Sequence, residues 1–140
     1  MARLIYIDTN IYLDYLENRT DKMRPLGEFA YEVFRRAFGC EFKIIVSEHL
    51  LDELEKFVTE QEIGFVLGKI KSAGKEVPLE VLESDIQKAN ALAAQRKVPW
   101  PDTLHAVLAI RGGAECIVTR NKKDFDPLSD LIEAVFPEEI

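Results

Sequence analysis

Four acidic residues stand far apart in the sequence, and each borders a run of apolar residues: Asp8, Glu53, Asp102 and Asp124. Because apolar runs become buried, we expect folding to gather these acids at one edge of the core. Carboxylates held close together repel one another unless a cation lies between them. Mg²⁺ and Mn²⁺ prefer oxygen ligands of this kind. The pattern therefore predicts a divalent metal site, with Asp8 and Asp102 as its direct ligands.

Such a site could hydrolyse phosphodiester bonds, because a carboxylate-bound metal ion activates water and stabilises charge on the phosphoryl oxygens. Glu53 could bind a second ion, hold a metal-bound water or act as a general base. Asp124 or Asn121 would complete the set of ligands. We therefore predict that Asp8, Glu53, Asp102 and Asp124 are the catalytic and metal-binding residues.

Segments with the apolar pattern of strands alternate with segments that have the period of helices. Strands are predicted at residues 4–7, 42–46, 76–82, 116–119 and 131–136. Helices are predicted after residue 8 and at residues 26–38, 48–58, 63–70, 84–93 and 103–111. This order is typical of a mostly parallel central sheet covered on both faces, so we expect a three-layer α/β/α sandwich. Ligands of such sheets bind beyond the carboxyl ends of the strands, where Asp8 and Asp124 are expected.

Single residues indicate where several of these helices begin. Ser47 is predicted to be the N-cap of the third helix, and Asp102 the N-cap of the last one. Ser84 and Gln87 have the spacing of a capping box, which would open the helix between them. His49 is expected on the exposed side of the third helix.

Composition limits the class of protein. The chain has 140 residues, 47% of them apolar, which suits one domain spanning residues 1–140. Its formal net charge of −7 argues against a broad nucleic-acid-binding surface, because such surfaces neutralise phosphates with Lys and Arg. Cys40 and Cys116 suggest reduced thiols, and no apolar stretch approaches the roughly 20 residues of a membrane span. Since the start does not resemble a secretory leader, we expect a cytoplasmic protein.

Four short motifs occur in the order and strand context of a known family. They are Asp8-Thr9-Asn10, Ser47 with Glu53, Pro101-Asp102-Thr103-Leu104-His105-Ala106, and Thr119-Arg120-Asn121-Lys122-Lys123-Asp124-Phe125. With these motifs the chain resembles the PIN domain family, especially the VapC-type toxin ribonucleases. The resemblance extends from Arg3 to about Pro137.

The resemblance implies a PIN-like fold and a metal-dependent endoribonuclease that hydrolyses RNA, as the toxin of a type II toxin-antitoxin pair. It implies Mg²⁺ (or Mn²⁺) as the cofactor, a small antitoxin protein as a partner, and a homodimer. Asp8, Glu53 and Asp102 match the acidic metal-site residues of the family. The fourth position of the family pattern falls on Asn121 or Asp124.

The residues around the acids are expected to contact the substrate: Thr9, Asn10, Thr119, Arg120, Asn121 and Lys122. Thr9, Asn10 and Thr119 could position a water molecule or a phosphate oxygen. Arg120 and Lys122 would attract the RNA backbone through charge, which carries no base information.

Other functional classes were weighed against this reading. A phosphotransferase of the haloacid dehalogenase type needs a second Asp two residues after Asp8, where this chain has Asn10. A response-regulator receiver needs an acidic pair before its phosphorylated Asp, but the strand that ends at Asp8 is the first in the chain. His105, one helical turn after Asp102, is expected to support the site or pack rather than act as a base. The alternative that stays open is a PIN-like interaction or RNA-processing module with weak or no catalysis.

Overall fold

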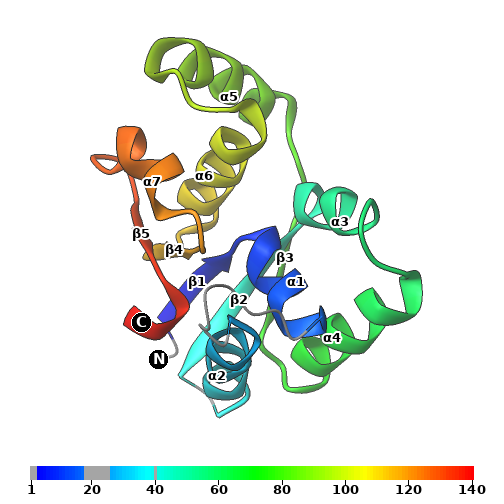
Figure 1. The fold of residues 1–140 in the computed structure, drawn as a ribbon. Helices are drawn as coiled ribbons and strands as arrows, with labels where there is room; N and C mark the ends of the chain where they lie inside the picture. Colours follow the sequence, from blue (N-terminus) through cyan, green and yellow to red (C-terminus); the bar gives the residue numbers. More distant parts are fainter. Residues whose placement is uncertain (1–2, 18–25, 40) are drawn as a thin grey trace.

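Five parallel strands form the central sheet of the protein in a computed structural model that describes residues 3–17, 26–39 and 41–140. The strands are β1 (Arg3–Ile7), β2 (Phe42–Ser47), β3 (Glu76–Leu79), β4 (Cys116–Val118) and β5 (Glu133–Val135). Their order across the sheet is β3-β2-β1-β4-β5, as Figure 1 shows. The predicted parallel sheet is confirmed.

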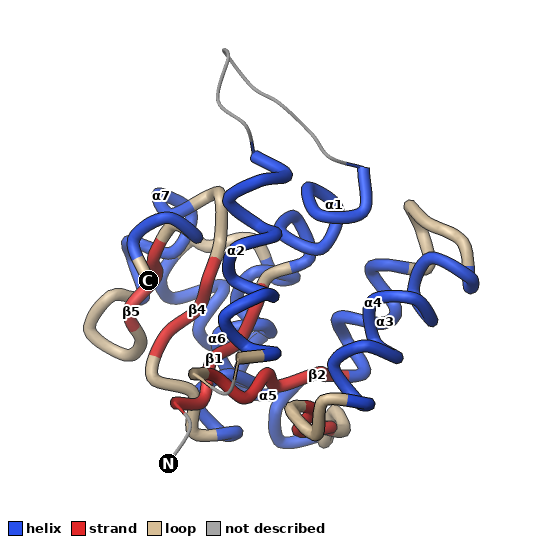
Figure 2. Tube along the Cα trace, turned by 90° about the horizontal axis from the view of Figure 1, so that it is seen from below, coloured by secondary structure: helices blue, strands red, loops and turns tan. Residues whose placement is uncertain are grey.

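Helices cover both faces of this sheet. They are α1 (Thr9–Glu17), α2 (Leu26–Phe38), α3 (Glu48–Leu54), α4 (Glu60–Ser72), α5 (Glu83–Arg96), α6 (Trp100–Gly112) and α7 (Lys122–Phe125). Two short 3₁₀ turns at 126–128 and 137–139 flank β5. In Figure 2 the helices (blue) lie around the strands (red).

Alternate residues of the inner strands β1, β2 and β4 belong to two separate hydrophobic cores. Ile5, Ile7 and Ile44 pack with side chains from α1 to α4, whereas Tyr6 and Ile45 pack with side chains from α5, α6 and α7. Because successive side chains of a strand point to opposite faces, an inner strand of a covered sheet is apolar on both. This is why these strands appear in the sequence as mainly apolar runs. The three-layer α/β/α sandwich is confirmed.

The order of the strands leaves room for a ligand-binding site at the carboxyl edge of the sheet, beside β1. From β1 the chain builds β2 and β3 on one side, and then crosses back to build β4 and β5 on the other. The ends of β2 and β4 therefore diverge on either side of β1, which is where parallel α/β sheets bind ligands. Asp8 follows β1, α3 follows β2, and Thr119 follows β4 at this carboxyl edge.

The helix predicted at residues 48–58 is shorter in the structure. It ends at Leu54, and the carbonyl of Leu54 accepts hydrogen bonds from the N–H groups of Phe57 and Val58. Thr59 then caps α4 through a capping box with Glu62, so α4 begins at Glu60, ahead of the predicted start at residue 63. Phe57, which falls inside the predicted helix, is 62% exposed because it lies in the turn between α3 and α4.

Two predicted helix starts were also wrong. Helix α5 begins before Ser84, because the Asp85 side chain accepts a hydrogen bond from the N–H of Leu82 and forms the first turn there. Helix α6 begins at Trp100 with Pro99 as its N-cap, and Asp102 lies inside the first turn. Proline at the second helical position suits a first turn, where an N–H would have no partner within the helix.

Cys40 lies outside the described residues, and Cys116 is a buried free thiol whose pKa is raised to about 11, chiefly by burial. None of the helices in the described ranges combines the length and apolar composition needed to cross a membrane.

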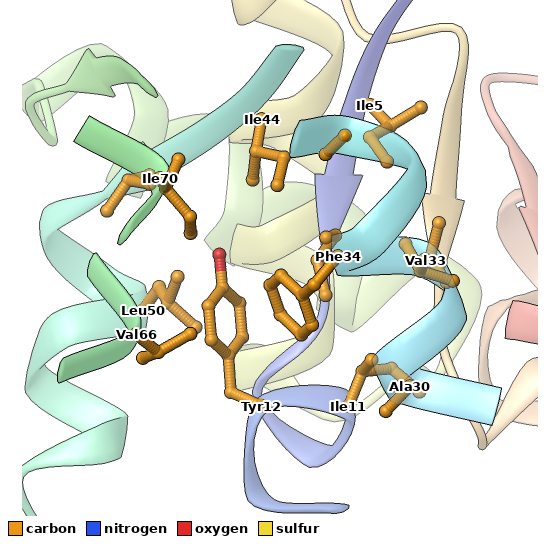
Figure 3. Packing of buried hydrophobic residues seen from close by; sticks show 14 of the residues in the cluster. Ile5, Ile11, Tyr12, Ala30, Val33, Phe34, Ile44, Leu50, Val66 and Ile70 are labelled. Carbon is orange, nitrogen blue, oxygen red and sulfur yellow. The ribbon is translucent and has the colours of Figure 1, made fainter. Parts of the chain in front are cut away.

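One polar atom in the core under α1 and α2 is buried without a partner. The Tyr12 side chain is fully buried, and its hydroxyl has no hydrogen-bond partner among the described residues. Figure 3 shows the hydroxyl directed toward the space between Ile44 and Ile70, while the ring packs edge-on against Phe34 at 5.1 Å. Burial raises the pKa of Tyr12 well above its usual range, so the hydroxyl stays neutral.

We therefore expect Tyr12→Phe to raise the free energy of unfolding by about 1 kcal/mol, because an unsatisfied buried hydroxyl costs more than it contributes. Urea denaturation followed by circular dichroism measures the change. Tyr15→Phe, on the partly exposed side of the same helix, should change stability by less than about 0.5 kcal/mol. A clear loss of stability in Tyr12→Phe would show that the hydroxyl has a partner in solution.

Candidate active site

The carboxylate of Asp8 is held at the end of β1 by three donors. Its Oδ1 accepts the N–H of Thr9 at 2.7 Å, and its Oδ2 accepts the hydroxyl of Thr119 at 2.8 Å and the amide of Asn10 at 3.3 Å. Asp8 is only 5% exposed. Two of these donors belong to the first residues of α1, directly after Asp8, and the third, Thr119, follows the neighbouring strand β4. The carboxylate is therefore held at the carboxyl edge of the sheet by both strands.

Glu53 reaches the same edge from α3. Ser47 caps that helix as predicted, because its Oγ accepts the N–H of Leu50. The Oε1 atom of Glu53 accepts the hydroxyl of Thr9 and Nε2–H of His105, each at 2.5 Å. Burial alone would raise the pKa of Glu53, but the hydrogen bond and charge of His105, with the Thr9 hydroxyl, lower it to about 2. Glu53 is therefore an anion with one oxygen already engaged.

A chain of buried hydrogen bonds holds His105 against Glu53. The other ring nitrogen of His105, Nδ1, lies 2.5 Å from the Tyr6 hydroxyl, which lies 2.7 Å from Ser47 Oγ. When the imidazole is neutral, Ser47 donates to Tyr6 and Tyr6 donates to Nδ1. When it is charged, both bonds reverse. In both states Nε2 keeps the proton that it donates to Glu53.

His105 itself is fully buried beside two acids. Its Nε2 lies 3.6 Å from Asp8 Oδ1 in addition to the contact with Glu53. Burial lowers the pKa of His105, but the hydrogen bond to Glu53 and the charges of Asp8, Glu53 and Asp102 outweigh burial and raise it overall. The side chain thus supplies positive charge to a cluster of negative groups.

Asp102 faces the other acids from the first turn of α6. Burial raises its pKa, and the negative charge of Asp8 raises it further, to about 6. The charges of Asp124 and Glu53 act in the same direction. Acids from four separate parts of the chain thus lie close enough for three of them to oppose the ionisation of Asp102. We call Asp8, Glu53, Asp102 and Asp124 the acidic cluster.

The fourth position of the cluster lies in the loop after β4 and in α7. Asp124 is exposed in α7, yet its charge acts on Asp102. Asn121 is exposed as well, and its N–H donates to Thr119 Oγ1 at 3.1 Å. Both side chains are exposed, and Asp124 is the one whose charge reaches Asp102.

Several residues predicted to contact substrate instead bond to acidic side chains of the protein. Thr9 and Thr119 are buried and donate their hydroxyls to Glu53 and Asp8, so they hold carboxylates in place. Arg120 forms an ion pair with the buried Asp14 at 2.6 Å.

Asn10 and Lys122 form contacts that connect separate segments of the chain. Asn10 accepts the N–H of Arg120 at 3.2 Å, which links α1 to the loop after β4. Lys122 forms an ion pair with Glu139 at 3.1 Å. Arg120 and Lys122 are therefore each paired with an acid outside the acidic cluster.

Histidine 49 was expected on the exposed side of α3, and that prediction is wrong. His49 is 8% exposed and its Nε2 lies 3.0 Å from the carbonyl of Pro101 and 3.8 Å from Glu53 Oε2. Its ring meets Trp100 edge-on at 5.8 Å. The first turn of α6 covers this face of α3, which single-helix periodicity could not reveal. The four-residue spacing from His49 to Glu53 was the available signal, because it places both on one face.

Two donor sets in this region could hold a metal ion. The acidic cluster offers only carboxylate oxygens, which suit Mg²⁺ or Mn²⁺, and the raised pKa of Asp102 shows that the negative charge there is not balanced by the protein. Separately, ligand atoms of His49, Glu53 and His105 lie within 4.8 Å of one another. Glu53 belongs to both sets.

Comparison with known proteins agrees with this geometry. The model of the PIN domain family matches residues 5–130. The fold is similar to that of VapBC2 from Rickettsia felis bound to a DNA fragment from their promoter, with a TM-score of 0.64 and 18% identity over 94% of this chain and 98% of that chain. It is also similar to a toxin-antitoxin complex from Klebsiella pneumoniae, with a TM-score of 0.62 and 21% identity over 97% and 99%. No individual curated protein sequence matches.

The chain therefore belongs to the PIN domain family. The resemblance inferred from the four sequence motifs is confirmed, and so is the PIN-like α/β fold.

The crowding of carboxylates predicts that ionised Asp102 lowers the free energy of unfolding of the metal-free protein. The folded chain holds the Asp102 proton up to a pH of about 6, whereas the usual value is 3.8, so stability should fall as the pH rises through this window. The full shift corresponds to about 3 kcal/mol, and solvent near this partly exposed group reduces it to about 1–2 kcal/mol. At pH 7, Asp102→Asn should be more stable than the wild type by this amount in the presence of a chelator.

Thermal or urea denaturation at pH 4 and pH 7 measures this difference. The gain should appear at pH 7 and largely vanish at pH 4, where wild-type Asp102 is protonated when folded. Asp52→Asn, on the exposed side of α3, is the matched control and should change little at either pH. Destabilisation by Asp102→Asn at pH 7 would mean that the acids are not crowded as described.

Proposed function

We propose that this PIN domain protein is a metal-dependent endoribonuclease that hydrolyses RNA phosphodiester bonds as the toxin of a type II toxin-antitoxin pair. The observation that carries the proposal is the convergence of carboxylates at the carboxyl edge of the sheet: hydrogen bonds hold Asp8 and Glu53 there, and Asp102 faces them with its pKa raised by burial and then by their charges. A protein gains nothing in stability from confining four carboxylates, so the arrangement favours a functional cation at that place. The family and the two similar folds support the same conclusion.

The contacts of each residue suggest its role in metal binding and hydrolysis. Asp8 and Asp102 would hold Mg²⁺ (or Mn²⁺), with Glu53 and Asp124 or Asn121 completing the set. The bound ion would supply charge stabilisation at the phosphoryl oxygens and a more acidic water. Because Oε1 of Glu53 accepts from Thr9 and His105, Oε2 is the atom left to orient a water molecule or receive its proton.

RNA must approach a protein whose formal net charge is −7, so its contacts with the backbone have to be local. Arg120 and Lys122 lie in the loop beside the acidic cluster, where they can exchange their partners Asp14 and Glu139 for phosphate groups. Asn121 is exposed between them. These groups bind the backbone and leave the choice of RNA sequence to other features.

The direct test is cleavage of a mixed RNA pool with Mg²⁺ or Mn²⁺. Wild-type protein should cleave with either ion and stop when a chelator is added. Asp8→Asn should lower the rate on the order of 100-fold or more, since it removes a charged ligand while keeping the shape of the side chain. Gel analysis of end-labelled RNA measures cleavage, and Mn²⁺ titration by calorimetry measures binding. Equal cleavage by both proteins would assign the activity to a contaminant.

Expression in a bacterial host separates the toxin from the alternative, a PIN-like interaction or RNA-processing module. A toxin should slow growth on induction, and Asp8→Asn should abolish that effect at equal protein levels. Metal-dependent cleavage without growth arrest would favour RNA processing. Absence of both cleavage and metal binding would favour an interaction module.

A groove formed by α1, α2 and α4 supports the proposal of an antitoxin partner. It has a volume of about 650 Å³ and is lined by aromatic side chains, including Tyr15, Tyr31 and Phe65. Tyr31 and Phe65 are 52% and 55% exposed, which is unusual for large apolar residues that lie side by side. Arg35 and Lys69 at the same groove favour an acidic or amphipathic segment of a small protein.

A second apolar surface supports the proposal of a homodimer. Ile110 and Leu131 are each 42% exposed and line a largely apolar cavity of about 460 Å³ beside α5 and α6. We expect the wild type to sediment as a dimer in analytical ultracentrifugation and Leu131→Glu as a monomer, because a buried charge without a partner opposes association. Phe65→Glu, on the other side of the sheet, should stay dimeric. A dimer that survives Leu131→Glu would contradict this choice of surface.

A further inference from the structure

His49, Glu53 and His105 form a group of mixed nitrogen and oxygen donors beside the acidic cluster. One ligand atom from each lies within 4.8 Å of the others. Both imidazoles are shielded from solvent, at 8% and 0% exposure, and their ring centroids are 4.3 Å apart. The all-carboxylate reading of the site gives His105 a supporting role at Glu53 and gives His49 none.

The carboxylate of Glu53 lies between the two imidazoles. Its Oε1 is 2.5 Å from Nε2 of His105, and its Oε2 is 3.8 Å from Nε2 of His49. One oxygen therefore faces each ring. A cation that enters this space meets two nitrogens and a carboxylate at once.

We propose that His49, Glu53 and His105 form a second metal site, which takes a transition-metal ion such as Zn²⁺ and, when occupied, withdraws Glu53 from the acidic cluster. The existence of the site is independent of the proposed nuclease function. Its consequence, inhibition of RNA cleavage by Zn²⁺, rests on that function.

The donor set decides which ion binds. Imidazole nitrogen is a good ligand for Zn²⁺ and a poor one for Mg²⁺, which prefers oxygen and retains its waters. Two histidines and one glutamate are a known zinc ligand set, with the fourth position left to water. The acidic cluster offers oxygen alone, so the two neighbouring sites differ in the ions that they select.

Small adjustments of the side chains would suffice for tetrahedral coordination. Ligand atoms on a tetrahedral zinc ion are about 3.3 Å apart, given bond lengths of about 2.0–2.1 Å. The His105–Glu53 contact has to open from 2.5 Å, and the His49–Glu53 contact has to close from 3.8 Å. In effect, the ion would replace the proton that His105 Nε2 shares with Glu53.

The surroundings hold both rings in place. The Tyr6 hydroxyl lies at the second nitrogen of His105 and can accept its N–H, which is the support that metal-bound histidines usually have. Nε2 of His49 donates its N–H to the Pro101 carbonyl at 3.0 Å. A metal ion bound at this nitrogen would replace that hydrogen bond, and the ring proton would move to Nδ1.

An ion can reach His49 and Glu53 from solvent. A cavity of about 410 Å³ is lined by His49, Glu53, Asp52, Lys56 and Trp100 among others, and His105 lies buried behind Glu53. The cavity opens on the side of α3 and α6, whereas Asp8 lies at the end of β1 and does not line it. Zn²⁺ would therefore enter from this side and adjoin the acidic cluster through Glu53, which it shares, and through His105, whose Nε2 is 3.6 Å from Asp8 Oδ1.

Binding is tested on the whole chain with Zn²⁺ by calorimetry and with Co²⁺ by visible absorption, since Co²⁺ takes zinc sites and is coloured. We expect one ion per chain and, for His49→Ala, affinity for Zn²⁺ lower by about tenfold or more. His49→Cys should restore binding, because thiolate is also a zinc ligand. Its Co²⁺ form should show a thiolate-to-cobalt charge-transfer band that the wild type lacks, which would prove ligation at position 49.

Asp52→Ala is the matched control, because Asp52 lines the same cavity but lies outside the group. It should bind Zn²⁺ as the wild type does. Equal loss in Asp52→Ala and His49→Ala would show diffuse attraction of cations by acids and overturn the site. Unchanged binding in His49→Ala, or the lack of a charge-transfer band in His49→Cys, would overturn it as well. Circular dichroism confirms that each variant is folded.

The consequence is tested by RNA cleavage in Mg²⁺ with increasing Zn²⁺, each variant being compared with its own rate without Zn²⁺. Wild type and Asp52→Ala should be inhibited at the concentration at which Zn²⁺ binds, and His49→Ala only at about tenfold more. Zinc binding without any nuclease activity would leave the site standing and refute the proposed function. Cleavage that Zn²⁺ inhibits equally in all three proteins would refute the consequence while the proposed function stands.

Discussion

Repulsion between carboxylates is the constraint on which the rest of this site depends. The sheet brings acids from the end of β1, from the last turn of α3, from the first turn of α6 and from α7 to one edge, where burial strengthens every charge interaction. The protein stabilises the charges of these acids to different extents. Asp8 receives three hydrogen bonds and Glu53 receives two, whereas the pKa of Asp102 rises to about 6. The charge of Asp102 is thus the one that its surroundings stabilise least, and a bound cation would neutralise it without a proton.

The buried contact between His105 and Glu53 links this edge to the core of the protein. Through His105 the carboxylate is connected to Tyr6 inside β1 and to Ser47 at the end of β2. Tyr6 faces the core under α5 and α6, so the same side chain packs the sheet and positions the site. Rigid support of this kind keeps an acidic side chain in place without a bound cation. It also brings imidazole nitrogen within reach of a metal ion, which an all-carboxylate site would lack.

Much of the architecture was predictable because apolar periodicity reflects burial directly. The strands around Ile5, Ile44 and Ile117 are apolar on both faces, a pattern that only a covered parallel sheet satisfies. Helix ends were less predictable. Asp102 has the side chain of an N-cap, yet the rigid ring of Pro101 moved the start of α6 back to Trp100. Where two neighbouring residues each favour a different first residue of a helix, the packing of the whole helix decides where it begins.

By itself the sequence determined the layers of the fold, the family, and which acids border the ends of buried elements, because these follow from the local alternation of apolar and polar residues. Only the tertiary structure decided what surrounds those acids. His49 was expected in solvent and lies against α6, and Arg120 faces Asp14. The physical reason is distance along the chain: His105 and Glu53 are 52 residues apart, and no local pattern records a contact that exists only when β1, α3 and α6 are packed together.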